Sequence, residues 1–227
     1  MRTAAALIGL VSLTCLACMN ARPHTIESRL AQFEVPVRER LASAFQQAEA
    51  PWPPARLTLL AFKGERLLEA WVPGPDGAWV FLKTYPILAA SGSLGPKLRE
   101  GDRQVPEGIY RIEYLNPNSR FHLSLKLDYP NAFDRARAQE EGRTHPGSDI
   151  MIHGSDASIG CLAMGDPAAE ELFVMAARPG IEQVRVIIAP VDLRVRPAPV
   201  LEGHPPWTPG LYGQIQEALR TYPARRE

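Results

Sequence analysis

Through the middle of the chain, short apolar runs alternate with turn residues at the spacing of β-strands. Residues 56–87 contain three such runs, which are separated by turn residues at Lys63–Gly64 and Pro73–Gly77. Because strands of this length and spacing recur further along, the central part of the chain is predicted to form a sheet. Four more strands are predicted, at residues 105–115, 120–129, 148–154 and 183–195.

The two ends of the chain have helical spacing instead. Residues 25–49 carry apolar side chains at helical intervals, with a break predicted at Val35–Pro36, and residues 211–222 form a second amphipathic segment. A third helix is predicted between the last two strands, with Asp166 as its N-cap and Pro167 at its first position. The pattern therefore predicts a mainly β fold with short helices and helical N- and C-terminal flanks.

The first 18 residues have the features of a secretory signal. A basic start is followed by an apolar run from Thr3 to Ala17, which is shorter than the roughly 20 residues of a membrane span. Cys18 follows Leu16 and Ala17, as in the motif that precedes a lipid-modified cysteine, although Cys15 stands where that motif usually has Leu or Val. Export is therefore expected. Attachment through a lipid at Cys18 is favoured, and plain cleavage near Cys18 is the alternative.

Together these signals divide the chain into four segments. Residues 1–18 are the signal peptide, 19–54 the helical N-terminal flank, 55–194 the β domain, and 195–227 a Pro-rich linker with the C-terminal helix. A hydrophobic fraction of 45% indicates a globular protein. The 25 basic and 25 acidic side chains give a formal net charge of zero without a run of like charges, so nucleic acid is not an expected partner.

Cys161 is the one cysteine outside the N-terminal apolar stretch, and three roles are open to it. It could be a buried small apolar residue, a metal ligand or a nucleophile. A single thiol with His153 eight and His145 sixteen residues before it lacks the ligand spacing of a zinc site, so no metal or other cofactor is predicted. As a nucleophile, it would need a lowered pKa and a nearby base, and His153 ends the preceding apolar run.

The loop between His153 and Cys161 has the residues that a folded-back turn requires. Gly154 and Gly160 permit tight turns, so the imidazole and the thiol could meet. The backbone N–H groups of Gly160 and Cys161 could hold the oxyanion of a tetrahedral intermediate. This arrangement would suit attack of a thiolate on an amide carbonyl, with His153 protonating the leaving amine.

Several motifs resemble those of the L,D-transpeptidase (YkuD-type) catalytic domain. They are "IHG" followed by "SIGC" at residues 152–161, and "VPEGIY" at residues 105–110, which is similar to the "TPxGxY" turn of the family. The segment "LNPNSRFHLSLKLDYPNAFDRA" resembles the exported, murein-related branch of Gram-negative bacteria. The resemblance covers about residues 56–193, and it implies a β-sandwich or partly open barrel for the domain at 55–194.

The resemblance also implies an activity. Members act on peptidoglycan stem peptides, where the cysteine attacks a carbonyl, usually of meso-diaminopimelate, and forms a thioester that an amine or water resolves. Carried over by motif, Cys161 is the nucleophile and His153 the general acid and base. Ser158, Gly160 and Gly154 shape the loop at residues 154–161, the nucleophile loop.

The sequence departs from the family pattern on both sides of the cysteine. Ile159 stands where many members have His or Ser, and residues 162–164 (Leu-Ala-Met) replace an arginine that many members carry. Arg120 or Lys126 could supply the missing positive charge. The further candidates for substrate binding are His122, Arg120, Tyr129 and Asn131.

Each of these candidates has a structural alternative. His122 contacts substrate or lies on a strand face, and Tyr129 and Asn131 belong to a substrate-side loop or a tight turn. His145 is expected in a turn, although its spacing from Cys161 also occurs for the catalytic histidine of some members.

The main functional expectation is a periplasmic cysteine-dependent L,D-transpeptidase, attached by its lipid to the outer membrane. One alternative is an amide hydrolase of the same family that releases proteins or residues from diaminopimelate, with murein-linked protein as a partner. The other is a murein-binding module without catalysis, in which Cys161 is only a buried side chain.

Overall fold

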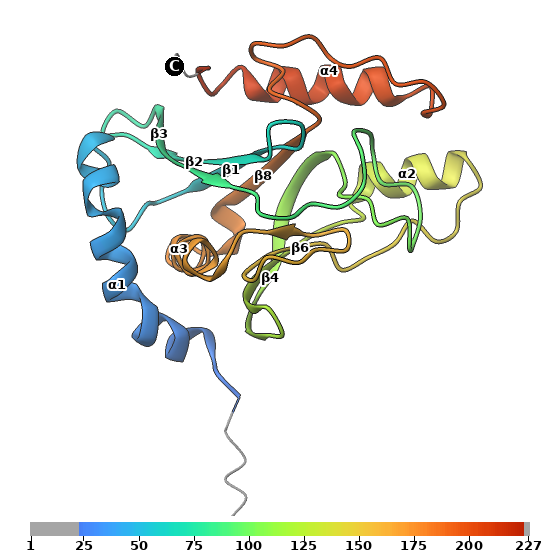
Figure 1. The fold of residues 1–227 in the computed structure, drawn as a ribbon. Coiled ribbons are helices and arrows are strands. Elements are labelled where there is room, and N and C mark those ends of the chain that lie inside the picture. The colour runs from blue at the N-terminus through green and yellow to red at the C-terminus, as the bar shows by residue number, and fades with distance from the viewer. Residues whose placement is uncertain (1–22, 225–227) are drawn as a thin grey trace, which may run out of the picture.

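The computed structural model describes residues 23–224, in which eight strands form one strongly curved sheet (Figure 1). The strand order is β3-β2-β1-β8-β4-β5-β6-β7, with mostly antiparallel pairing and two parallel pairs, β1 with β8 and β6 with β7. The predicted mainly β, partly open architecture is confirmed. The strands are β1 (Leu57–Phe62), β2 (Leu67–Pro73), β3 (Trp79–Pro86), β4 (Gly108–Ser119), β5 (His122–Leu127), β6 (Met151–His153), β7 (Leu162–Ala163) and β8 (Val184–Ala189).

Helices cover both faces of this sheet. One face packs against α1 (Ile26–Gln47) and α3 (Asp166–Ala177) around the larger apolar core, and the other face is covered by α4 (Thr208–Leu219). Figure 1 shows α4 above the sheet, α3 beneath it and α1 along one side. Period-2 alternation places the apolar side chains of β1 and β8 alternately in the two cores, so the flanking helices complete the domain. No helix in residues 23–224 is long and apolar enough to cross a bilayer.

The predicted break in the N-terminal helix is wrong. Helix α1 continues through Pro36 to Gln47 and buries one face, which includes Phe33, Val37 and Leu41. Proline costs a helix a hydrogen bond, but packing of this face against the core outweighs the local preference. The predicted signal peptide lies outside the described residues.

Two other predicted boundaries also need correction. Gly165, rather than Asp166, is the N-cap of α3, and the Asp166 carboxylate instead accepts a hydrogen bond from the Ser155 backbone N–H at 2.8 Å. The predicted loop or turn at residues 129–134 extends only to Asn131, which caps a helix, α2 (Ala132–Glu140), that was not predicted. Only Ala138 of α2 is buried, so the helix has no apolar periodicity to reveal it.

A buried ion pair ties the C-terminal helix to the segment that precedes β4. The Glu107 carboxylate accepts hydrogen bonds from Lys63 Nζ at 3.0 Å, the Gly95 N–H at 2.7 Å and the Tyr212 hydroxyl at 2.8 Å. Lys63 also donates to the carbonyls of Gly95 and Val105, and burial lowers its pKa although Glu107 is adjacent. The network fixes the segment between β3 and β4, residues 87–107, which also contacts the loop between His153 and Cys161.

Replacing Glu107 by alanine is expected to lower the free energy of unfolding by about 3–5 kcal/mol, because it leaves a buried ammonium without its carboxylate. Urea denaturation measures this loss. The matched control is Glu217→Ala, which breaks the exposed pair with Arg220 and should cost about 1 kcal/mol or less. Equal losses in the two variants would show that the buried network is not a major source of stability.

Candidate active site

The pairing of β6 with β7 brings the predicted histidine and cysteine to neighbouring strands. Ile152 pairs with Leu162 and His153 with Ala163, so the parallel register, continued back by one residue, places Cys161 beside Met151. Ile152 and Leu162 point into the core and are fully buried. Because strand side chains alternate, His153 and Cys161 both belong to the opposite, outer face of this strand pair.

The His153 ring is held in one tautomer by the backbone. Its Nδ1 lies 2.5 Å from the Gly154 carbonyl oxygen, which can only accept, so Nδ1 carries the proton in the neutral ring. Nε2 is then free to accept a proton. The Phe121 ring stacks on the imidazole with 4.6 Å between centroids, and burial, which leaves the residue 2% exposed, lowers the pKa of His153.

The Cys161 thiol is held by backbone groups. Met151 N–H donates to Sγ at 3.4 Å, and the thiol donates to the Asp149 carbonyl at 3.6 Å. Burial raises the pKa of Cys161, and the Asp149 carboxylate adds to the rise, while the Met151 N–H and the Lys97 ammonium oppose it. The lowered pKa that the sequence argument required is therefore absent from this geometry.

The lowered pKa of His153 and the raised pKa of Cys161 both favour the uncharged imidazole and thiol at neutral pH. No hydrogen bond joins the His153 ring to Cys161 among the contacts of residues 23–224. A reaction at this thiol would then need proton transfer from Sγ to Nε2 during the attack, because these contacts do not form a stable thiolate–imidazolium pair beforehand.

This neutral pair predicts the pH dependence of thiol alkylation in the free protein. A thiol with a raised pKa ionises at higher pH, so labelling of Cys161 by iodoacetamide should increase with a midpoint above the ordinary value of about 8.5. Mass spectrometry of the alkylated peptide over a pH series measures it. A midpoint well below 8.5 would indicate a preformed ion pair with His153.

Two serine hydroxyls fix the nucleophile loop. Ser158 Oγ accepts the Cys161 N–H at 2.9 Å and donates to the Cys161 carbonyl at 2.5 Å, while Ser91 Oγ accepts the Gly160 N–H at 2.6 Å. Gly160 has φ +98°, a conformation that favours glycine. Both predicted oxyanion donors are thus occupied by hydroxyl oxygens, which a substrate oxyanion would have to displace.

Ser91 and Phe121 are contacts of the site that the sequence argument missed. Ser91 lies in the segment between β3 and β4, and its hydroxyl also donates to the Arg103 carbonyl at 2.7 Å. Gly154 lies where a Cβ would come within 2.5 Å of Asp166 Oδ1 and 2.7 Å of the Phe121 carbonyl, so only glycine fits beside His153.

The surroundings of the thiol are partly apolar and carry charges of both signs. Ile159 is 78% exposed at the tip of the nucleophile loop, and it lines a cavity of about 220 Å³ together with Lys97, Arg103 and Asp149. Lys97 Nζ is paired with Asp102 at 2.5 Å. Residues 162–164 are almost fully buried, so the position of the family arginine is part of the core here.

The other predicted site residues have structural contacts. Tyr129 is buried and donates to the Pro146 carbonyl at 2.8 Å, and Asn131 caps α2. Lys126 pairs with Glu113 and with Asp149, while the Arg120 side chain is exposed in the β4–β5 turn.

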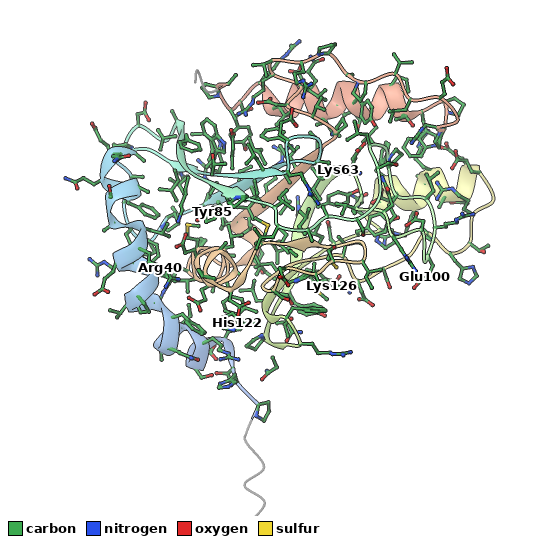
Figure 2. The ribbon with its side chains drawn as sticks, viewed as in Figure 1. Arg40, Lys63, Tyr85, Glu100, His122 and Lys126 are labelled. Atoms are coloured by element: carbon green, nitrogen blue, oxygen red, sulfur yellow. The ribbon has the colours of Figure 1, made fainter. Side chains whose placement is uncertain are left out.

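The two other histidines that the sequence analysis considered, His122 and His145, contact groups other than the thiol. His122, labelled in Figure 2 near α1 and α3, pairs with Glu170 at 3.0 Å and packs edge-on against Phe33. His145 is exposed, as predicted for a turn residue, and bonds to the Thr144 hydroxyl. Within residues 23–224, no cluster of three or more His, Cys, Asp or Glu side chains is placed to hold a metal ion.

Comparison with known proteins decides the family. Residues 64–188 match the YkuD family, described as the L,D-transpeptidase catalytic domain, and this match covers more than half of the chain. The chain belongs to the YkuD family. The predicted resemblance is thereby confirmed, and the His153–Cys161 strand pair lies inside the matched YkuD region.

Relatives of this YkuD domain carry transpeptidase names. The Escherichia coli K12 protein "Putative L,D-transpeptidase YafK" is 40% identical over 114 residues, which are 49% of this chain and 44% of that protein. The match thus spans less than half the length of that relative.

Solved structures show weaker similarity. Pgp2, a helical cell shape determining protein of Campylobacter jejuni, is 23% identical over 60% of this chain and 48% of its own, with a TM-score of 0.49. L,D-transpeptidase 1 of Mycobacterium tuberculosis is 13% identical over 59% and 61% of the two chains, with a TM-score of 0.34.

Proposed function

We propose that this YkuD-family protein is a cysteine-dependent L,D-transpeptidase that acts on diaminopimelate-containing stem peptides of peptidoglycan. The observation that carries the proposal is the β6–β7 register, which puts the tautomer-fixed His153 and the Cys161 thiol on one outer face. Family membership and the name of the E. coli relative support the reaction class.

The proposed reaction has two halves that share the same residues. His153 Nε2 takes the proton of Cys161 as Sγ bonds to the donor carbonyl carbon, and it returns that proton to the leaving amine when the amide C–N bond breaks. The thioester is then attacked by an acceptor amine, which loses its proton to His153. The C–S bond breaks, and His153 returns that proton to Sγ, so that the neutral thiol and imidazole are restored. If water attacks instead, the same steps give hydrolysis.

Hydrolysis is the second candidate, and one observation favours it. The family pattern often has an arginine where this chain buries residues 162–164 in the core. The substrate groups that this arginine would bind therefore need other partners here. A peptide amine need not be held for hydrolysis, because an ordered water is sufficient. Protein linked to diaminopimelate is the substrate that we infer for this alternative.

Mass spectrometry of products separates the two reactions. The purified protein is incubated with tetrapeptide-bearing muropeptides in one experiment and with a protein-linked muropeptide in another. Crosslinked dimers from the first support transfer. If protein is released from the protein-linked muropeptide and no dimers form from the tetrapeptide-bearing muropeptides, the reaction is hydrolysis and not transfer. If neither substrate changes covalently, the protein is a non-catalytic murein-binding module.

We also propose that the protein is exported and attached by a lipid at Cys18, with the catalytic domain in the periplasm. The support is the apolar run that ends at Leu16, Ala17 and Cys18. Met19 follows, rather than the aspartate that commonly signals retention in the inner membrane, so the outer membrane is the proposed site of attachment. Intact-mass measurement of the mature protein tests this, because a mature N-terminus without a lipid adduct would reduce the proposal to plain secretion.

A further inference from the structure

A second cavity lies on the α4 side of the sheet. It has a volume of about 740 Å³ and lies where the start of α2 and the segment after α4 approach the ends of β1, β8 and β4. None of the residues that line it belongs to β6, β7 or the nucleophile loop. Three arginines line this cavity: Arg56, Arg111 and Arg185.

Strand register gathers these arginines on one face. Arg111 of β4 is directly paired with Arg185 of β8, and Arg185 is in turn paired with Thr58 of β1. Paired residues project to the same side, so two guanidinium side chains leave the sheet next to each other. Arg56 precedes Thr58 by two residues, and its guanidinium lies 5.0 Å from the centre of the Trp79 ring.

The positive charge of the group is only partly balanced by the carboxylates that line the same cavity. No carboxylate in residues 23–224 forms an ion pair with Arg56, Arg111 or Arg185, and all three side chains are exposed. The cavity also contains Asp128 and Glu182. The Asp128 carboxylate accepts the Arg111 backbone N–H at 2.9 Å, so one of its oxygens is already used.

A directly opposed pair of like charges destabilises a sheet. An anion between the two guanidinium groups would remove that repulsion, because arginine binds carboxylates through two parallel hydrogen bonds. Apolar walls from Trp79, Phe133 and Tyr222 would contact the aliphatic part of such a ligand. The cavity therefore fits a peptide that carries free carboxylates better than an isolated inorganic ion.

The face that carries the arginines continues toward the cysteine. Two residues beyond Arg111 on β4, Glu113 pairs with Lys126, and Lys126 pairs with Asp149, whose backbone carbonyl accepts the Cys161 thiol proton. A polymer that supplies peptides to the thiol could therefore contact both places along one surface.

We propose that this cavity is a second peptide-binding site, in which Arg111, Arg185 and Arg56 hold the free carboxylates of a peptidoglycan stem peptide that is not being cleaved. The inference rests on the proposed function, because that function makes peptidoglycan the polymer at this surface. The site would keep the enzyme on its polymer between reactions and raise the local concentration of peptides at Cys161.

The test measures binding and catalytic-site occupancy separately. A fluorescein-labelled diaminopimelate-containing stem tetrapeptide is titrated into the full-length Cys161→Ser protein and followed by anisotropy. In the wild-type protein, protection of Cys161 from iodoacetamide reports peptide at the thiol. The anisotropy should show a phase that the same peptide with amidated carboxyl groups lacks, and added salt should weaken this phase.

Arg111→Gln and Arg185→Gln should each weaken the carboxylate-dependent phase about 10-fold, the scale of one charge-assisted pair, without altering protection of Cys161. Arg38→Gln, on the exposed side of α1, is the matched control and should change nothing. The proposal is overturned if the double Gln variant keeps the phase or if the amidated peptide binds equally well. If the arginine-dependent phase persists while Cys161 is neither protected nor acylated, the proposed function falls and the second site stands.

Discussion

Replacing Cys161 by alanine is expected to abolish thioester formation and turnover altogether. Cys161 is the only free cysteine among residues 23–224, so no other described thiol can take its place. The measurement is product formation from muropeptides, together with intact-mass detection of the acyl-enzyme. Substantial residual turnover in Cys161→Ala would remove the cysteine from the mechanism.

A matched variant separates loss of the nucleophile from damage to its loop. Ser158→Ala deletes the hydroxyl that bonds both the N–H and the carbonyl of Cys161 but leaves the thiol in place. This variant should retain measurable acyl-enzyme formation at a lower rate. If Ser158→Ala and Cys161→Ala were equally inactive, the result for the cysteine variant could reflect the loop rather than the sulfur.

Replacing His153 by alanine is expected to reduce kcat about 100-fold or more, the usual scale for loss of a positioned acid and base. Its Nδ1 contact with the Gly154 carbonyl leaves Nε2 as the atom that exchanges protons with Cys161 and the leaving amine. Steady-state kinetics over a pH series measures the effect. Because burial lowers the pKa of His153, the neutral base should persist to lower pH than an exposed histidine, and activity limited by its protonation should decline only in that lower range.

The control for the histidine is His145→Ala. His145 is exposed and contacts the Thr144 hydroxyl, so its loss should leave kcat nearly unchanged. A larger loss for His145→Ala than for His153→Ala would reverse the choice between the two histidines that the sequence motif favoured.

The strands could be predicted because they are short apolar runs bounded by turn residues. In β1 and β8 every second side chain enters the larger core, and most of the others are buried as well. Each strand is therefore a nearly continuous apolar run in the sequence. Helix α2 buries only Ala138, so its sequence has no apolar pattern that would predict it. The break predicted at Pro36 is absent from α1 because local propensity does not include the packing energy of the helix face.

The candidate site could be predicted only as far as its motif extends. His153, Gly154 and Cys161 are close in sequence, whereas Ser91 and Phe121 reach the same place from distant segments. The pairing of Arg111 with Arg185 depends on strand register, which alternation alone does not specify.

The contact between α4 and the sheet changes what counts as the smallest foldable unit of this protein. A chain shortened after residue 194, at the boundary that composition suggests, would lose Leu211 and Ile215 from the second core and expose the apolar residues beneath them. It would also take the Tyr212 hydroxyl from Glu107. Excision of the family-matched region alone is therefore expected to give an aggregation-prone fragment, and grafting this domain onto another protein requires its C-terminal helix as well.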